Sequence, residues 1–146
     1  MELNQDFKEF IELLNNHNVK YMVVGGYAVG YHGHPRFTGD IDFWVAISMD
    51  NALKIVAVLN EFGFGNLSLK AEDFTENNVV VQLGYEPNRI DILTSLSGVQ
   101  FDECYANSVV ADFEGLKIHF IDLKDLKKNK ASTGRAKDLG DIENLT

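Results

Sequence analysis

Two aspartates that stand one residue apart, Asp40 and Asp42, are the first candidates for chemistry in this chain. They open a mostly apolar segment, residues 40–47, that has the composition of a β-strand. In a strand, side chains two positions apart point to the same face, so both carboxylates would project from one side. Two carboxylates roughly 4 Å apart repel by about 4 kcal/mol at an effective dielectric of about 20 unless a proton or a cation lies between them. The pair therefore indicates a cation site, although the spacing alone also fits an exposed strand face that binds nothing.

A third aspartate, Asp91, interrupts the apolar residues of a later segment, 90–93. An ionised side chain is rarely buried in an apolar strand unless it has a partner. Asp91 could pair with Arg89 or with a nearby lysine. It could instead belong to the same acidic cluster as Asp40 and Asp42. The residue pattern leaves both explanations open.

Two glycines, Gly25 and Gly26, follow the short apolar run 21–24, which has the character of a buried strand. Glycines at the junction of a strand and a helix let the backbone approach a ligand closely, and the first N–H groups of the helix can bind an anion. A tight turn without a ligand fits the same residues. The chain contains neither GxGxxG nor GxxxxGK[ST], which disfavours Rossmann and P-loop nucleotide binding.

The elements that must position these residues alternate between helical and strand periodicity. The patterns predict helices over 3–14, 27–32, 50–62 and from 123 onward, and strands over 21–24, 40–47, 79–83, 89–93, 109–113 and 116–121. The strand pairs 79–83 with 89–93 and 109–113 with 116–121 are expected to form antiparallel hairpins. Such a mixture favours an α+β fold with a mixed sheet over a doubly wound parallel one.

The ends of the helices carry local signals of their own. Asp50 is expected to cap the helix 50–62, which should end near Gly63, and Asp122 is expected to cap the helix that follows it. In the tail, an apolar stripe at threefold spacing is expected to face the core; it consists of Ala136, Leu139, Ile142 and Leu145.

Composition and charge exclude several classes of protein. The 146 residues suit a single domain, 1–146, and 45% hydrophobic residues exclude extensive disorder. With 13 Lys+Arg and 22 Asp+Glu the net charge is 13 − 22 = −9, which argues against a broad basic surface for duplex nucleic acid. No apolar run approaches the length of a membrane span, and the lone cysteine, Cys104, is expected to be buried packing. We therefore expect a cytoplasmic protein without a membrane segment.

Taken together, the glycine pair and the three aspartates resemble the DNA polymerase beta-like nucleotidyltransferase superfamily. Its hallmark is a strand ending in Gly-Gly, a helix, an Asp-x-Asp on the next strand and a third Asp on a later strand. The segment GGYAVGYHGHPRFTGDIDF is similar to a small prokaryotic branch that includes abortive-infection (AbiEii) type toxin nucleotidyltransferases. His32, Arg36 and Thr38 match positions of that branch, and so do Lys130 and Arg135 in the tail.

The resemblance implies a nucleotidyltransferase fold, a mixed β-sheet with helices packed on one face, and transfer of a nucleoside monophosphate from a nucleoside triphosphate to an acceptor hydroxyl. By this likeness, Asp40 and Asp42 would hold two Mg²⁺ (or Mn²⁺) ions. Asp91 would contact the catalytic ion and act as the base. Gly25 and Gly26 would bind the β and γ phosphates through backbone N–H groups.

The resemblance implies nucleotide contacts for several other residues, and for most of them a purely structural role fits as well. Arg36 would clamp the triphosphate or pair with the acidic strand, and Thr38 lies in the same nucleotide-binding motif. Lys130 and Arg135 would reach phosphates from the closing helices, or the lysine-rich tail is a solvated helix face. Trp44 would stack on a base or, more simply, pack against the closing helices.

The sequence leaves the acceptor open: RNA or tRNA, a protein or a small molecule. One alternative is a catalytically silent nucleotidyltransferase fold that serves as a binding partner in a toxin–antitoxin or similar complex. Another is an antibiotic nucleotidyltransferase.

Overall fold

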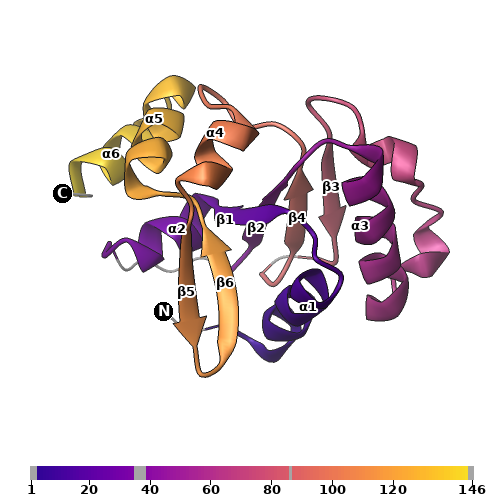
Figure 1. Ribbon diagram of the computed structural model, residues 1–146. Helices are drawn as coiled ribbons and strands as arrows, with labels where there is room; N and C mark the ends of the chain where they lie inside the picture. The colour runs from indigo at the N-terminus through magenta and orange to yellow at the C-terminus, as the bar shows by residue number, and fades with distance from the viewer. Residues whose placement is uncertain (1–2, 35–38, 86, 145–146) are drawn as a thin grey trace.

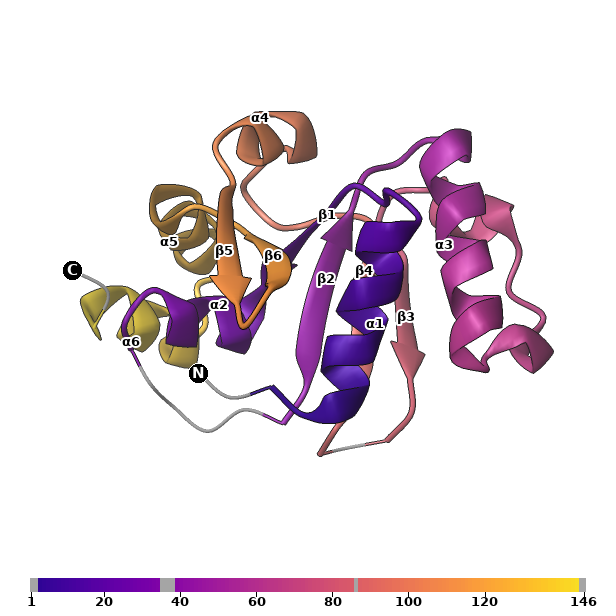
Figure 2. The ribbon, with the colours of Figure 1, turned by 60° about the horizontal axis from the view of Figure 1, so that its bottom comes forward.

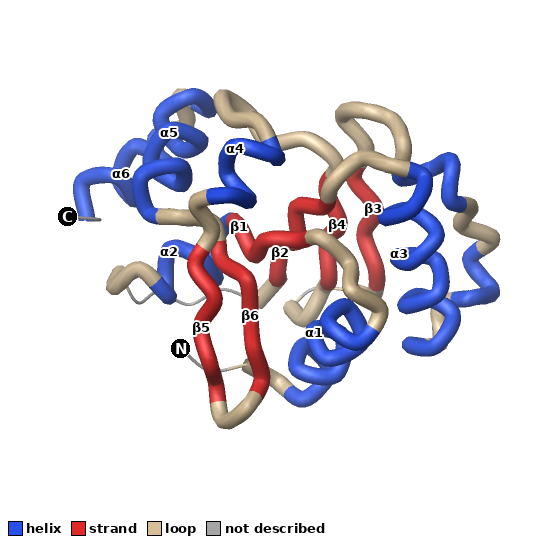
Figure 3. Tube along the Cα trace, viewed as in Figure 1, coloured by secondary structure: helices blue, strands red, loops and turns tan. Residues whose placement is uncertain are grey.

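A six-stranded mixed sheet forms the centre of the computed structural model, which describes residues 3–34, 39–85 and 87–144 (Figures 1 and 3). The strands are β1 (Tyr21–Val24), β2 (Ile41–Val45), β3 (Val80–Leu83), β4 (Ile90–Leu93), β5 (Val109–Phe113) and β6 (Leu116–Phe120). The helices are α1 (Gln5–Asn16), α2 (Gly25–Tyr31), α3 (Met49–Phe62), α4 (Phe101–Ala106), α5 (Leu123–Thr133) and α6 (Ala136–Asn144), with short 3-10 turns at Gly65–Leu67 and Ala71–Phe74. This architecture confirms the predicted α+β fold.

The order of the strands in the sheet is β3-β4-β2-β1-β6-β5. Both predicted hairpins are present, since β3 pairs antiparallel with β4 and β5 pairs antiparallel with β6. The central pairings join segments that lie far apart in the sequence: β2 runs antiparallel to β1 and parallel to β4, and β1 runs parallel to β6. The ends of β1, β2 and β4 that carry the candidate site residues therefore meet at one end of the sheet.

Helices α1 and α3 supply the main apolar layer against the sheet (Figure 2). The buried side of α1 includes Phe10, whose ring lies 5.4 Å from that of Phe43 on β2. Trp44, the next residue of β2, points to the opposite face and is 2% exposed, with its ring 5.2 Å from Phe101 of α4. Trp44 thus packs against a helix, and its burial leaves no ring face for a nucleotide base. Helices therefore cover both faces of the sheet, and not one face as the family resemblance implied.

Three local expectations need correction. Helix α2 begins at Gly25, so the glycine pair forms its first residues and not a separate turn. Helix α3 is capped by Ser48, whose side chain accepts a hydrogen bond from the Asn51 amide, while Asp50 forms an ion pair with Lys54. The sequence patterns also missed helix α4.

The predicted apolar stripe of the tail is wrong for the residues that the structure describes. On α6, Ala136 and Leu139 are exposed, whereas Asp138 and Asp141 are buried. Leu145 lies outside the described residues. Helix α6 therefore packs through charged side chains, a possibility that hydrophobic periodicity does not consider.

Cys104 is buried, as expected, and burial is the main reason that the pKa of its thiol rises to about 12. Across residues 3–34, 39–85 and 87–144, every helix is too short or too polar to cross a membrane.

Candidate active site

The sheet register brings two of the three predicted carboxylates together. Asp42 on β2 lies directly opposite Asp91 on the adjacent parallel strand β4. Residues that pair across neighbouring strands point to the same face of a sheet, so the two carboxylates project side by side. This pairing makes Asp91 a neighbour of the Asp-x-Asp motif.

Asp42 is in an unfavourable electrostatic position. Its pKa rises from 3.8 to about 7, chiefly because the side chain loses contact with water, and further because of the charge and hydrogen bond of Asp91 and the charge of Asp40. The positive charge of Lys130 acts in the opposite direction. Near neutral pH the Asp42–Asp91 pair therefore favours a bound proton or a bound cation.

Arg89 links the other two aspartates. Its Nε and Nη2 donate to the two carboxylate oxygens of Asp91, at 2.7 and 3.0 Å. Its Nη2 also lies 3.2 Å from Asp40 Oδ2, and its backbone N–H donates to Asp40 Oδ1 at 3.1 Å. The first explanation that the sequence left open for Asp91 thus holds, because Asp91 pairs with Arg89. The second holds in part, because Asp91 lies beside Asp42 but does not form one cluster with both Asp40 and Asp42. The spacing of Arg89 and Asp91, two positions apart on one strand face, was the available signal for a shared role.

Gly25 lies against this carboxylate pair. It has φ +68°, and a Cβ at this position would overlap Asp42 Oδ2. Only glycine adopts this backbone conformation without strain and leaves room for the carboxylate. The first turn of α2 is thereby held against the end of β2. Gly26, the next residue, is buried.

Lys130 is not part of a solvated helix face. It is 5% exposed, and its Nζ lies 2.8 Å from Asp138 Oδ1 and 3.4 Å from Asp141 Oδ2. Arg135 is largely exposed, and its Nε lies 2.7 Å from Asp138 Oδ2. Both predicted phosphate ligands thus converge on Asp138, and only Lys130 affects the electrostatics of Asp42.

Two predicted nucleotide contacts, Arg36 and Thr38, lie outside the described residues. His32, which matches the same branch motif, is engaged with the backbone: one of its ring nitrogens lies 2.7 Å from the Ile121 carbonyl oxygen. That contact connects the end of α2 to the residue that follows β6.

The described residues do not bring three metal-binding side chains together. Within residues 3–34, 39–85 and 87–144, no three His, Cys, Asp or Glu side chains are grouped closely enough to hold an ion. Asp42 and Asp91 form a close pair, while Asp40 is held by Arg89. A three-carboxylate site requires Asp40 to turn toward the pair.

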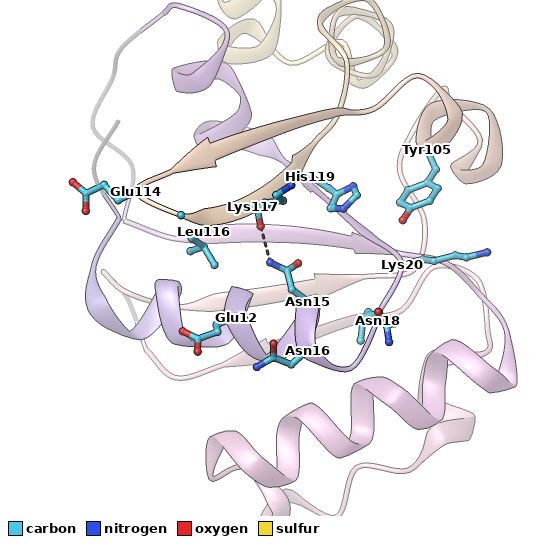
Figure 4. Close-up of a pocket in the computed structure, with 12 residues that line it drawn as sticks. Glu12, Asn15, Asn16, Asn18, Lys20, Tyr105, Glu114, Leu116, Lys117 and His119 are labelled. Atoms are coloured by element: carbon cyan, nitrogen blue, oxygen red, sulfur yellow. Dashed lines mark hydrogen bonds between the residues drawn. The ribbon is translucent and has the colours of Figure 1, made fainter.

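A separate pocket, with a volume of about 830 Å³, lies at the other end of β1, beside the last turn of α1 and the β5–β6 hairpin (Figure 4). The residues that line it include Glu12, Asn15, Lys20, Tyr105, Lys117 and His119. Lys20 precedes β1, whereas Gly25 follows it, so this pocket is remote from the carboxylates.

One protein-family model matches the whole chain. Residues 1–146 match the model of the family "Nucleotidyltransferase of unknown function (DUF6036)". None of the curated proteins matches the chain.

Three solved structures share the fold at low sequence identity. A proposed nucleotidyltransferase from Thermotoga maritima (TM1012) has a TM-score of 0.64 and 15% identity, over 94% of this chain and 88% of that one. The lincomycin-bound lincosamide antibiotic adenylyltransferase LnuA has a TM-score of 0.60 and 14% identity, over 98% and 96%. An antigenic nucleotidyltransferase-like protein from Paracoccidioides brasiliensis has a TM-score of 0.57 and 14% identity, over 98% and 77%.

Proposed function

Because the chain belongs to the nucleotidyltransferase family whose model spans residues 1–146, we propose that it transfers a nucleoside monophosphate from a nucleoside triphosphate to an acceptor hydroxyl at the Asp42–Asp91 pair. One observation carries the proposal: two carboxylates on adjacent parallel strands share one face, and the glycine that opens α2 lies against them. The structural neighbours support the fold on which this arrangement rests.

The carboxylate pair suits Mg²⁺ or Mn²⁺. Carboxylate oxygens are the hard ligands that these ions prefer. The pKa of Asp42 is raised by burial and then by the negative charge of Asp91, and a bound cation would offset that charge. Asp42 and Asp91 would hold the metal, and Asp40 would join them once it leaves Arg89. When bound, the metal would neutralise charge on the attacking and leaving oxygens of the α-phosphoryl group.

The chain's own residues have defined tasks in this reaction. The acceptor oxygen forms a bond to the α-phosphorus, the bond from that phosphorus to the pyrophosphate oxygen breaks, and the acceptor proton moves to a carboxylate oxygen of Asp91. Arg89 donates one hydrogen bond to each oxygen of Asp91, and each carboxylate oxygen keeps a second lone pair that can accept the proton.

Phosphate binding would fall to residues around the pair. Gly25 and Gly26 would offer backbone N–H groups, and Lys130 and Arg135 would offer positive charge from α5 and the loop after it. Arg36 and Thr38 keep the roles that the family resemblance implies for them.

The acceptor is proposed from the family likeness and from the structural neighbours. The likeness to the abortive-infection branch favours RNA, tRNA or a protein as acceptor and an antitoxin as partner, in the cytoplasm. A small-molecule acceptor is the second candidate, because the adenylyltransferase LnuA matches this chain over 96% of its own length.

A label-transfer assay tests the proposal. The protein is incubated with each α-³²P-labelled NTP, Mg²⁺ or Mn²⁺ and a cell extract, and the labelled products are separated into RNA, protein and small molecules. We expect label in one fraction with the wild type and none with Asp42→Asn. Glu76→Gln, which removes a negative charge from an exposed side chain, serves as the control and should remain active. Absence of label with every nucleotide would instead favour a catalytically silent binding partner.

A further inference from the structure

A buried ion cluster lies in the contact between α5 and α6. Asp138 is 0% exposed, Asp141 is 4% exposed and Lys130 is 5% exposed. Asp138 accepts hydrogen bonds from Lys130 Nζ at 2.8 Å, from Thr133 Oγ1 at 2.6 Å and from Arg135 Nε at 2.7 Å. Asp141 gives Lys130 a second carboxylate at 3.4 Å. Every charge in the cluster therefore faces an opposite charge.

Stability alone is a poor reason for such a cluster. Removing charges from water is costly, and well-packed apolar side chains of similar volume often hold two elements together as well as a buried ion pair does, or better. The described apolar residues of α6 nevertheless are not buried, since Ala136 and Leu139 are exposed and Ile142 is only half-buried. Helix α6 thus brings two carboxylates to a lysine where apolar packing would be expected.

The position of Lys130 in the fold indicates a role at the Asp42–Asp91 pair. Helix α5, which carries Lys130, packs against α2, and the first residue of α2, Gly25, lies against Asp42. The positive charge of Lys130 acts on Asp42. Asp138 and Asp141 hold the ammonium of Lys130 in one place, at 2.8 and 3.4 Å from its Nζ.

We propose that Asp138 and Asp141 are positioning residues that hold the ammonium of Lys130 in place, aimed at the phosphates of the nucleotide bound at the Asp42–Asp91 pair. This inference rests on the proposed function, because it requires a nucleoside triphosphate at that site. Helix α6 then acts as part of the active site through Lys130, without contacting the substrate through its own carboxylates.

A double-mutant cycle tests whether the carboxylates act through the lysine. The probes are the α,β-methylene analogues of ATP, GTP, CTP and UTP, each with Mg²⁺, and the dissociation constant of the tightest one is measured by calorimetry. Lys130→Ala should weaken binding by about tenfold to hundredfold, the range for a charged hydrogen bond. Asp138→Asn and Asp141→Asn should each weaken binding in the wild-type background, and neither should have a further effect in the Lys130→Ala background.

Two more variants separate positioning from folding. Asp125→Asn removes a different buried carboxylate of α5, outside the cluster, and should bind the analogue as the wild type does. The triple variant Lys130→Met, Asp138→Leu, Asp141→Leu replaces the ions by apolar side chains, and it should stay folded yet bind as weakly as Lys130→Ala. In the label-transfer assay, Asp138→Asn should raise KM for the nucleotide more than it lowers kcat, because Lys130 holds the substrate.

The outcomes are distinguishable. Wild-type binding of the triple variant, or of both single aspartate variants, would overturn the positioning role and leave the proposed function intact. An equal loss from Asp138→Asn in both backgrounds would also overturn it, because Asp138 would then act independently of Lys130. If none of the four analogues binds the wild type, the proposed function itself fails, and the inference fails with it.

Discussion

Replacing Asp42 by asparagine should stabilise the protein, and the gain should grow with pH. The native side chain is half-buried beside Asp91, and its ionisation is opposed by burial and by the neighbouring negative charges. Asparagine has nearly the same shape and no charge to ionise. The variant therefore removes a pH-dependent cost from the folded state.

The size of the effect follows from the two pKa values of Asp42, 3.8 in the unfolded chain and about 7 in the folded one. Because the folded pKa is the higher one, the contribution of this group to stability is fully present below about pH 4 and is lost as the pH rises through about 7. Each pKa unit corresponds to about 1.4 kcal/mol, so the total loss is about 4 kcal/mol. Between about pH 5 and about pH 8 the loss is about 3 kcal/mol.

Urea unfolding at these two pH values measures the effect. The single tryptophan, Trp44, is buried and reports the transition by fluorescence, and circular dichroism provides a second probe. EDTA in the buffer removes divalent cations. The free energy of unfolding of Asp42→Asn should exceed that of the wild type by about 3 kcal/mol more at the higher pH than at the lower one.

The control and the refuting result are both simple. Glu76→Gln removes one negative charge from an exposed loop side chain and should change the free energy of unfolding by about 0.5 kcal/mol or less at either pH. If Asp42→Asn changes the free energy of unfolding equally at both pH values, the pKa of Asp42 is not raised in the folded protein, and the electrostatic argument for a cation beside Asp42 is wrong.

Four further predictions test the same site and its surroundings. Mg²⁺ or Mn²⁺ should raise the melting temperature, and more so with a nucleoside triphosphate; scanning calorimetry should show no such increase for Asp42→Asn. Asp91→Asn should bind the Mg²⁺ complex of a non-hydrolysable triphosphate in calorimetry yet transfer no label, and a variant with normal transfer would exclude Asp91 as the base. An alanine in the left-handed conformation costs about 1–2 kcal/mol. Gly25→Ala should lower the free energy of unfolding in urea by more than this amount, because its Cβ would also overlap Asp42. Gly134→Ala has the same φ of 68° without that overlap, so it should lower the free energy of unfolding only by the cost of the left-handed conformation. Burial alone would raise the pKa of Asp138, but hydrogen bonds from its partners lower this pKa to about 2. The contribution of Asp138 to stability is therefore present above about pH 4 and is lost below it. Between about pH 5 and about pH 2, the free energy of unfolding of the wild type should fall by about 2 kcal/mol more than that of Asp138→Asn.

Local sequence patterns were sufficient for most elements. The amphipathic helix α1, the buried strand β1 and both hairpins follow from spacings of apolar residues and from turn residues within a dozen positions. These features depend on interactions between near neighbours in the chain, which a single sequence displays directly. The common face predicted for Asp40 and Asp42 is not confirmed, because β2 begins at Ile41 and Asp40 lies before it.

The tertiary structure decided which of these residues meet. The parallel pairing of β2 with β4 sets Asp42 opposite Asp91, and a shift of one residue in that register would have turned the carboxylates to opposite faces. The same pairing lets Arg89 reach Asp40. Register between distant strands is set by the packing of the whole sheet, so no local pattern contains it.

In the tail, the sequence predicted the helices, but only the tertiary structure decided which helix face is buried. The sequence alone determined that residues 123 onward form helices, because the cap and the periodicity are local. It did not determine which face of α6 is buried. Hydrophobic periodicity favoured Leu139, but the buried ammonium of Lys130 on α5 made the face with Asp138 and Asp141 the one that packs inward. A charge can be buried when its partner is fixed opposite it, and only the folded chain places that partner.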